Sequence, residues 1–375
     1  MPFSYRAPRD ILFGRGQAGK AAAHVLAFGR RVVLVHGATP QRAQALIDDL
    51  AGQGADLRLV ACASEPDLPN LITTCDVFRD FDAQVVVAIG GGSVIDFAKA
   101  LSALLVCHGP ARDYLEIVGT GRRLDAAPLP MVALPTTAGT GAEVTKNAVI
   151  TVPDRALKVS LRDPRMVPQV AIIDPDLMQG APTSVVLPAA LDAITQVIEP
   201  YVGRNPNPMT DALCAAAIPR GLRALRPLIE DNDAKAMDDM AWVSTSGGLA
   251  LAHAGLGAVH GFAGVIGGQT GAAHGAICGA LLVPVLRANL ATVPANHLAA
   301  ERLRWVVSQI TQAFGGLGAL EVWARGAGLL RLSAMGVQAA DVPGIVTASQ
   351  GASSMKGNPV TLTTDQLTNV LTDAL

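Results

Sequence analysis

Short apolar runs alternate with amphipathic stretches along the first half of the chain. Five runs rich in β-branched residues are typical of strands, at residues 31–36, 57–60, 84–89, 130–134 and 170–173. Between several of them the apolar positions follow helical spacing, for example over residues 19–28 and 41–52. Apolar strands separated by helices indicate a parallel sheet covered on both faces, so this pattern predicts a Rossmann-like α/β domain.

The pattern changes after Asp174-Pro175-Asp176, where strand-like runs cease. Residues 181–184, Ala-Pro-Thr-Ser, look like a helix start with polar capping groups, and long Ala- and Leu-rich helical patterns follow to residue 375. A chain of 375 residues is also long for a single core. We therefore predict an α/β dinucleotide-binding domain over residues 1–180 and an all-helical domain over residues 181–375.

Composition narrows the class of protein. Half of the residues are hydrophobic and 16% are charged, which suits closely packed helices and a subunit contact, and so favours a homo-oligomer such as a dimer. A net charge of -2 and an aromatic content of 4% provide no basic surface and no stacking platform, which excludes nucleic-acid binding. The five cysteines lack CxxC spacing and fit the reduced thiols of a cytoplasmic protein.

Two segments bear on membrane association. Residues 1–6 lack the charged-then-apolar layout of a signal peptide. Residues 246–282 are apolar enough to resemble a membrane span, but their three histidines and many glycines favour a buried helical core. We predict a protein without a membrane partner.

A glycine-rich turn follows the strand-like run at residues 84–89. Its sequence, Gly90-Gly91-Gly92-Ser93, leads into a helix-like stretch that contains Asp96. Glycines let a large anion approach the backbone, and the N–H groups of the first helical turn would face that anion. The turn lacks the G-x-G-x-x-G spacing, yet it predicts a pyrophosphate site. A plain strand-to-helix turn is the alternative.

A threonine-rich segment follows the strand-like run at residues 130–134. Residues 135–145 read Pro-Thr-Thr-Ala-Gly-Thr-Gly-Ala-Glu-Val-Thr. They provide hydroxyls and glycines at the carboxyl end of a strand, where open α/β sheets bind ligands. A loop that caps a helix is the alternative, but beside the glycine turn the segment is better interpreted as the second wall of one cofactor cleft.

Candidate metal ligands are found in the predicted helical half. Asp192 and Gln196 are four residues apart, which places them on one helix face. His260 and His274 lie in glycine-rich, uncharged surroundings. Carboxylate and imidazole groups bind Zn²⁺ or Fe²⁺, and a three-ligand set with an open position can polarise a carbonyl. Histidines that are merely buried and hydrogen-bonded are the alternative interpretation.

Taken together and in this order, these motifs resemble the iron-containing (group III) alcohol dehydrogenase family, whose relatives include glycerol dehydrogenase and dehydroquinate synthase. The resemblance runs from residues 11–16 to residues 358–359 and is strongest over residues 90–99 and 135–145. It implies two domains with the active site between them, and hydride transfer between NAD or NADP and a small aldehyde or alcohol. It also implies a divalent metal ion, Fe²⁺ or Zn²⁺.

The resemblance assigns residues as well. The positions that match its cofactor-binding segments are Gly37, Thr39, Gly91, Gly92, Ser93, Asp96, Thr136, Thr137, Thr140 and Lys158. The positions that match its four metal ligands are Asp192, Gln196, His260 and His274, and of these Asp192, His260 and His274 are the candidate catalytic residues.

Three positions depart from the family's pattern. Gln196 stands where the family usually has histidine, and its neutral carbonyl oxygen implies weaker metal binding and a changed choice of metal. Gly264 stands where many members have a histidine near the nicotinamide, which removes a proton-relay group. Gly37 stands where NAD-preferring members often have aspartate, so NADPH should be tolerated. A left-handed turn is the alternative reason for a glycine at position 37.

Three other functions are compatible with the same resemblance. One is a metal-free reductase of the maleylacetate reductase kind, against which Asp192 and residues 135–145 argue. Another is a lyase like dehydroquinate synthase, which needs further basic residues, whereas residues 192–275 are poor in Lys and Arg. The third is a nucleotide-binding protein without activity, with which Gln196 and Gly264 are compatible.

Overall fold

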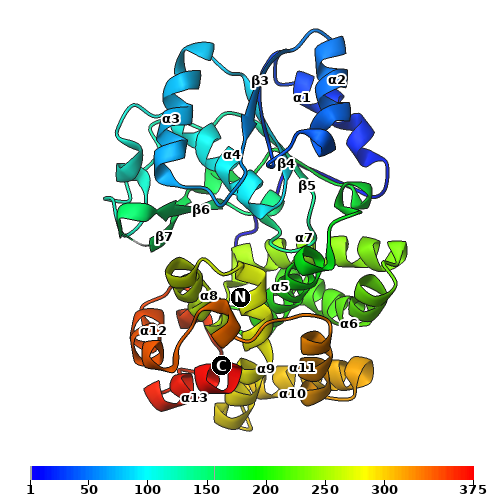
Figure 1. Ribbon diagram of the computed structural model, residues 1–375, viewed down its shortest axis with the longest axis vertical. Helices are drawn as coiled ribbons and strands as arrows, with labels where there is room; N and C mark the ends of the chain where they lie inside the picture. The colour runs from blue at the N-terminus through cyan, green and yellow to red at the C-terminus, as the bar shows by residue number, and fades with distance from the viewer. Residues whose placement is uncertain (1, 156) are drawn as a thin grey trace. The chain divides into compact units, whose positions relative to one another are not determined.

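The computed structural model describes residues 2–155 and 157–375 (Figure 1). The chain divides into two compact units. The α/β unit comprises Arg6–Thr137 and Gly141–Gln179, and the helical unit comprises Ala138–Thr140, Gly180–Leu375 and the N-terminal residues up to Tyr5. Each unit is described by itself below.

The α/β unit is built on a six-stranded sheet whose strand pairs are all parallel. In spatial order the strands are β1 (Asp10–Phe13), β8 (Val170–Ile173), β5 (Met131–Pro135), β4 (Val85–Gly90), β2 (Arg31–His36) and β3 (Asp56–Ala61). The strands β4, β5 and β8 are buried at every residue, because helices cover both faces of the sheet.

Alternate residues of each strand pack against different helices. Val32 and Leu34 point into a core that includes residues of α1 (Ala21–Leu26) and α2 (Gln44–Gly52). Val33 and Val35 point into a core that includes residues of α3 (Leu68–Phe78) and α4 (Gly92–Leu104). The predicted Rossmann-like α/β fold is therefore confirmed.

The five predicted strands are confirmed as β2, β3, β4, β5 and β8, each within one or two residues of its predicted bounds. Three further strands were not predicted. β1 is a four-residue strand, and β6 (Asn147–Val152) and β7 (Leu157–Arg162) form a separate antiparallel pair that packs on α4. Their residues alternate between buried and more exposed, so they lack the continuous apolar runs of the central strands.

The helical unit contains no strand among its described residues, so the predicted all-helical second half is confirmed. Its helices are α5 (Thr183–Val202), α6 (Pro208–Glu230), α7 (Ala234–Ala254), α8 (Ala258–Thr270), α9 (His274–Thr292), α10 (Leu298–Phe314), α11 (Leu317–Gly326), α12 (Val342–Gln350) and α13 (Thr364–Ala374). α5 packs against α6, α7 and α9, which explains why thirteen of its twenty residues are buried, eleven of them consecutive over residues 190–200 (Figure 1).

The predicted polar cap at the start of α5 is wrong. The helix does begin where expected, at Thr183, but its N-cap residue is Pro182 and no side chain caps it. Thr183 and Ser184 already lie inside the helix, where their hydroxyls cannot act as N-caps.

Two helices, α5 and α9, are long and apolar enough to cross a membrane, and α7 with α8 would pass the same test as one span bent by 100°. The most apolar windows of α5 and α9 are 72% and 50% buried within the protein. The two helices also pack against each other. Residues 246–282, which include parts of α7 and α9 and all of α8, thus contribute to the core of the helical unit.

Candidate metal centre and nucleotide-binding edge

The predicted cofactor residues of the α/β unit follow three neighbouring strands. β2 pairs with β4 and β4 pairs with β5, so Gly37, Gly91 and Thr136 lie at the same carboxyl edge of the sheet. From β2 the chain continues to β3 on one side, whereas from β4 it continues to β5 on the opposite side. Such a reversal of strand order marks the ligand site in open α/β sheets.

The glycine turn opens α4 without a side-chain cap. Gly91 is the N-cap residue and the helix begins at Gly92. Gly90 permits the tight turn, since a Cβ at this position would lie 2.5 Å from side-chain atoms of Val94. Gly91, Gly92 and Ser93 are partly exposed, so an anion can approach the first-turn N–H groups.

The threonines after β5 lie beside that turn. The N–H of Thr136 donates to the carbonyl oxygen of Gly90 at 2.9 Å, and a Cβ on Gly91 would lie 3.4 Å from Thr137 Oγ1. The two motifs therefore form one surface of the α/β unit. Thr140 belongs to the helical unit, so its cofactor contact stays a prediction.

Asp96 and Lys158 have structural partners within the α/β unit. Asp96 Oδ2 accepts the N–H of Val149 at 3.0 Å, and Asp96 Oδ1 lies 3.0 Å from Lys99 Nζ. Lys158, on β7, forms an ion pair with Glu65. These contacts account for both side chains structurally, and their cofactor contacts stay predictions.

Gly37 does not adopt the left-handed conformation, so the simple-turn explanation for this glycine is wrong. A Cβ at this position would meet no atom within 4 Å. The backbone there consequently accepts other residues, and glycine leaves open space beside the end of β2. Thr39, two residues on, is exposed.

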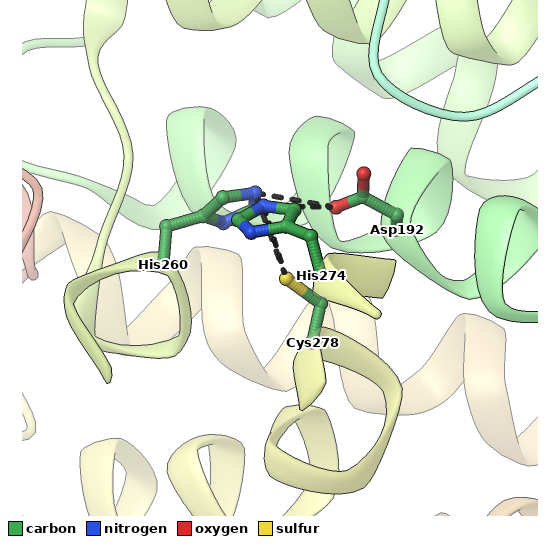
Figure 2. Close-up of side chains that lie close together, drawn as sticks. All are labelled: Asp192, His260, His274 and Cys278. Atoms are coloured by element: carbon green, nitrogen blue, oxygen red, sulfur yellow. Dashed lines mark hydrogen bonds and ion pairs between the residues drawn. The ribbon is translucent and has the colours of Figure 1, made fainter. Parts of the chain in front are cut away.

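Four side chains meet in the helical unit (Figure 2). Asp192 comes from α5, His260 from α8, and both His274 and Cys278 from α9. One ligand atom from each lies within 4.8 Å of all the others. The structure thus brings together the three predicted ligands Asp192, His260 and His274 and adds a cysteine. Gln196, the fourth predicted ligand, lies one turn after Asp192 on α5.

Two buried oxygen atoms at this cluster have no hydrogen-bond partner. They are Asp192 Oδ1 and Gln196 Oε1, in residues that are 1% and 2% exposed. Asp192 Oδ1 lies 3.3 Å from His260 Nε2 and 4.0 Å from His274 Nε2. Buried oxygens without partners are costly, and Asp192 Oδ1 faces two imidazole nitrogens that are good metal donors. The donor set therefore fits a divalent cation.

Glu199 fixes the orientation of His260. Its Oε2 lies 2.7 Å from His260 Nδ1, and its Oε1 accepts the N–H of Val259 at 2.8 Å. Glu199 is 5% exposed and needs Gly257 beside it, since a Cβ there would lie 2.7 Å from Glu199 Oε1. A proton held on Nδ1 leaves the lone pair of Nε2 directed at the cluster, as in metal sites whose histidines are oriented by carboxylates.

The clustered groups shift one another's pKa. Burial opposes the charged form of each, yet the His260 and His274 imidazoles lower the pKa of Asp192 to about 2. Against the same burial, Cys278 and Asp192 raise the pKa of His274 to about 9 and hold that of His260 well above its usual range. A metal ion that binds here has to displace protons from the imidazoles.

Gly275 brings α9 close to α5. A Cβ on Gly275 would lie 2.4 Å from the carbonyl oxygen of Pro188 and 3.3 Å from Asp192 Cβ. Because backbone atoms cannot yield as a flexible side chain does, Gly275→Ala is expected to separate the two helices. We predict a loss of about 1–3 kcal/mol in stability and weaker Zn²⁺ binding, measured by thermal unfolding and by metal titration.

Gly326→Ala is the matched control for that variant. Gly326 ends α11, and a Cβ there would meet no atom within 4 Å. Alanine in a helix is better than glycine by about 1 kcal/mol at most, so this variant should be as stable as the parent or slightly more stable. Equal melting temperatures and equal Zn²⁺ affinities for Gly275→Ala and the parent would contradict the close-approach argument.

Cys278 and Glu199 are two residues of the site that were not predicted from the sequence. Cys278 is four residues after His274, and Glu199 is three after Gln196, so both lie on helix faces already identified. The same spacing rule applied further along each helix could have found them. Gly264, four residues after His260 on α8, is exposed and has open space around it.

Comparisons with known proteins cover both units. A family model described as iron-containing alcohol dehydrogenase matches residues 8–175, and the C-terminal model of the Fe-containing alcohol dehydrogenase family matches residues 187–375. Alcohol dehydrogenase 4 of Saccharomyces cerevisiae (strain YJM789) is 36% identical over 227 residues, which is 60% of this chain and 58% of that protein. The alignment therefore spans less than two thirds of that relative.

Two further relatives match over longer stretches. NAD-dependent methanol dehydrogenase of Bacillus methanolicus is 30% identical over 283 residues, covering 74% of this chain and 73% of that protein. The solved structure of an alcohol dehydrogenase from Oenococcus oeni superposes with a TM-score of 0.86 at 25% identity, and the match covers 100% of both chains.

Proposed function

Since the chain belongs to the iron-containing alcohol dehydrogenase family, we propose that it transfers hydride between a nicotinamide dinucleotide and a small aldehyde or alcohol. The observation that carries this proposal is the cluster of Asp192, His260 and His274, in which the buried Asp192 Oδ1 has no hydrogen-bond partner. The names of the relatives, alcohol and methanol dehydrogenases, support the class of substrate.

The α/β unit supplies the cofactor half of the reaction. The first-turn N–H groups of α4 bind the pyrophosphate, and Thr136 and Thr137 position the ribose next to it. Holding the nicotinamide in one orientation supplies much of the rate enhancement, because the reacting carbon atoms are kept at attack distance. Gly37 places no carboxylate at the end of β2, so nothing at that position repels the 2′-phosphate of NADPH.

The helical unit supplies the site that activates the carbonyl group of the substrate. Asp192, His260 and His274 would hold Fe²⁺ or Zn²⁺, an ion that polarises a carbonyl and stabilises an alkoxide when bound. Glu199 keeps His260 in the tautomer whose Nε2 faces the cluster. Because position 264 is glycine, the proton for the alkoxide oxygen has to come from His274, from water or from a substrate hydroxyl.

We also propose that the protein acts as a cytoplasmic homodimer. The low charged fraction, 16%, supports a subunit contact. All five cysteines are free, which supports a reducing compartment.

The proposal is tested with purified protein whose metals have been removed by chelation. NADH or NADPH and a panel of short aldehydes are added with Zn²⁺, with Fe²⁺, or with neither. We expect cofactor oxidation that depends on the metal and proceeds with both cofactors. No oxidation under any metal condition would overturn the proposal. Cofactor binding without turnover would favour the nucleotide-binding alternative, and full turnover without metal the metal-free reductase.

A further inference from the structure

We propose that Cys278, and not Gln196, is the fourth protein ligand of the metal, so that this site prefers zinc to iron. The inference rests on the proposed function only in assuming that the cluster holds a divalent ion. Cys278 is completely buried, on the first turns of α9, one helical turn after His274. Figure 2 shows its sulfur beside the imidazoles of His260 and His274.

The distances at Cys278 match those of a tetrahedral zinc site. Zn–S bonds of about 2.3 Å and Zn–N bonds of about 2.0–2.1 Å, at a tetrahedral angle, put nitrogen and sulfur about 3.5–3.6 Å apart. The sulfur of Cys278 lies 3.6 Å from His274 Nε2 and 3.8 Å from His260 Nε2. The same bonds put nitrogen and oxygen about 3.4 Å apart. Asp192 Oδ1 lies 3.3 Å from His260 Nε2 and 4.0 Å from His274 Nε2, so the His274 ring has to move closer to the carboxylate when the ion binds.

Two imidazole nitrogens converge on this one sulfur, which is a weak hydrogen-bond donor and a weak acceptor. In its neutral form with the Nδ1 proton on the Glu199 side, His260 directs the lone pair of Nε2 at the cluster. One shared cation satisfies both nitrogens, the sulfur and the partnerless Asp192 Oδ1 together.

Gln196 has a different role in this arrangement. Its side chain forms a hydrogen bond with the Asp192 carboxyl group, so the amide supports a ligand on the same helix face. Thiolate is a soft donor that selects zinc, whereas an amide oxygen is a weak neutral donor. An Asp/His/His/Cys set restores the count of four protein ligands that the histidine missing at position 196 would otherwise reduce to three. A substrate oxygen then has to bind as a fifth ligand, an expansion that zinc permits.

Cobalt is the probe that tests the ligand set, since Co²⁺ bound to thiolate shows a ligand-to-metal charge-transfer band in the near ultraviolet. The full-length protein is stripped of metal and loaded with Co²⁺, and its spectrum is compared with those of Cys278→Ser, Gln196→Ala and Cys214→Ser. Cys214 is a buried cysteine on α6 outside the cluster, and serves as the control thiol. We expect the band in the parent, Gln196→Ala and Cys214→Ser proteins, and its loss in Cys278→Ser.

If Cys278→Ser fails to bind cobalt, X-ray absorption spectroscopy of zinc bound to the parent protein tests the sulfur ligand directly. One sulfur scatterer at about 2.3 Å is expected, and a first shell of nitrogen and oxygen alone would overturn the proposal. A charge-transfer band retained in Cys278→Ser would overturn it as well.

Metal competition tests the zinc preference separately. The preference for Zn²⁺ over Fe²⁺ should be larger in the parent protein than in Cys278→Ser, because Zn²⁺ exceeds Fe²⁺ in affinity even at sites without sulfur. Cys278→Ser should lose more than about 100-fold in Zn²⁺ affinity, since even residues that only orient a ligand contribute 10–100-fold. Equal Zn²⁺ affinity in the parent and Cys278→Ser proteins would contradict the assignment. None of these readouts needs turnover, so a sulfur-ligated but inactive protein would reject the proposed function and leave the ligand assignment standing.

Discussion

Asp192→Ala is expected to release the metal and to lower kcat/KM for aldehyde reduction by about a thousandfold or more. Asp192 is buried at 1% exposure, and it is the cluster's only metal-facing carboxylate in the described part of the chain. Its loss removes an oxygen ligand and leaves the buried His260 imidazole and the partly exposed His274 imidazole without their counter-charge. Metal-assisted charge stabilisation is worth several kcal/mol, and each 1.36 kcal/mol corresponds to about tenfold in rate.

Metal content by mass spectrometry and steady-state kinetics measure this effect together. Asp192→Asn keeps the shape of the side chain and tests whether charge, rather than packing, is responsible. Asp365→Ala, at an exposed position in the first turn of α13, is the control and should retain both metal and activity. An Asp192→Asn protein with full metal content and unchanged kcat/KM would show that this carboxylate is not a ligand.

The sequence alone predicted those helices and strands that have a clear local pattern of apolar and polar residues. A strand such as Val85–Gly90 is buried along its whole length, so its apolar run identifies it without reference to other segments. The pair β6 and β7 is stabilised by packing on α4, a contact between distant segments that leaves only a short alternating pattern. Hydrophobic periodicity alone could not separate that pattern from a loop.

In the candidate site, too, some residues could be identified from local patterns and others depend on contacts between distant segments. The spacing of Asp192 and Gln196 and the resemblance to a family indicated which residues meet, and the cluster contains three of those four. The fourth atom of the cluster, the sulfur of Cys278, is placed by the packing of α9 against α5 and α8, which no local pattern encodes. Glu199 likewise acts on a histidine 61 residues further along the chain.

In the motif around α4, a residue that the family resemblance assigned to the cofactor has a structural role. Asp96 was predicted as a cofactor residue, yet its carboxylate joins α4 to β6 through Val149 and pairs with Lys99. Lys99 itself donates to Thr145 Oγ1 at 2.9 Å and to the carbonyl oxygen of Asn147. The motif therefore fixes the start of the β6–β7 pair as well as the turn that precedes it.

Lys99→Ala is therefore expected to destabilise the α/β unit by about 3–5 kcal/mol, the range found when one partner of a buried ion pair is removed. Lys99 is 0% exposed and Asp96 is 16% exposed, so the remaining carboxylate is poorly solvated. Thr145 and Asn147 lose a donor at the same time, and the removed methylenes leave a cavity. Denaturant unfolding followed by circular dichroism measures the change.

A double variant separates the effect of the unpaired charge on stability from the effect of the lost packing. Lys99→Met with Asp96→Asn keeps most of the volume, removes the uncompensated charge, and leaves an amide oxygen to accept the N–H of Val149. It should recover a large part of the lost stability, because replacing both partners of a buried ion pair costs far less than removing one. Lys235→Ala, at an exposed position on α7, is the control and should change stability by about 0.5 kcal/mol or less. If Lys99→Ala unfolds at the same denaturant concentration as Lys235→Ala, the buried ion pair does not stabilise this unit.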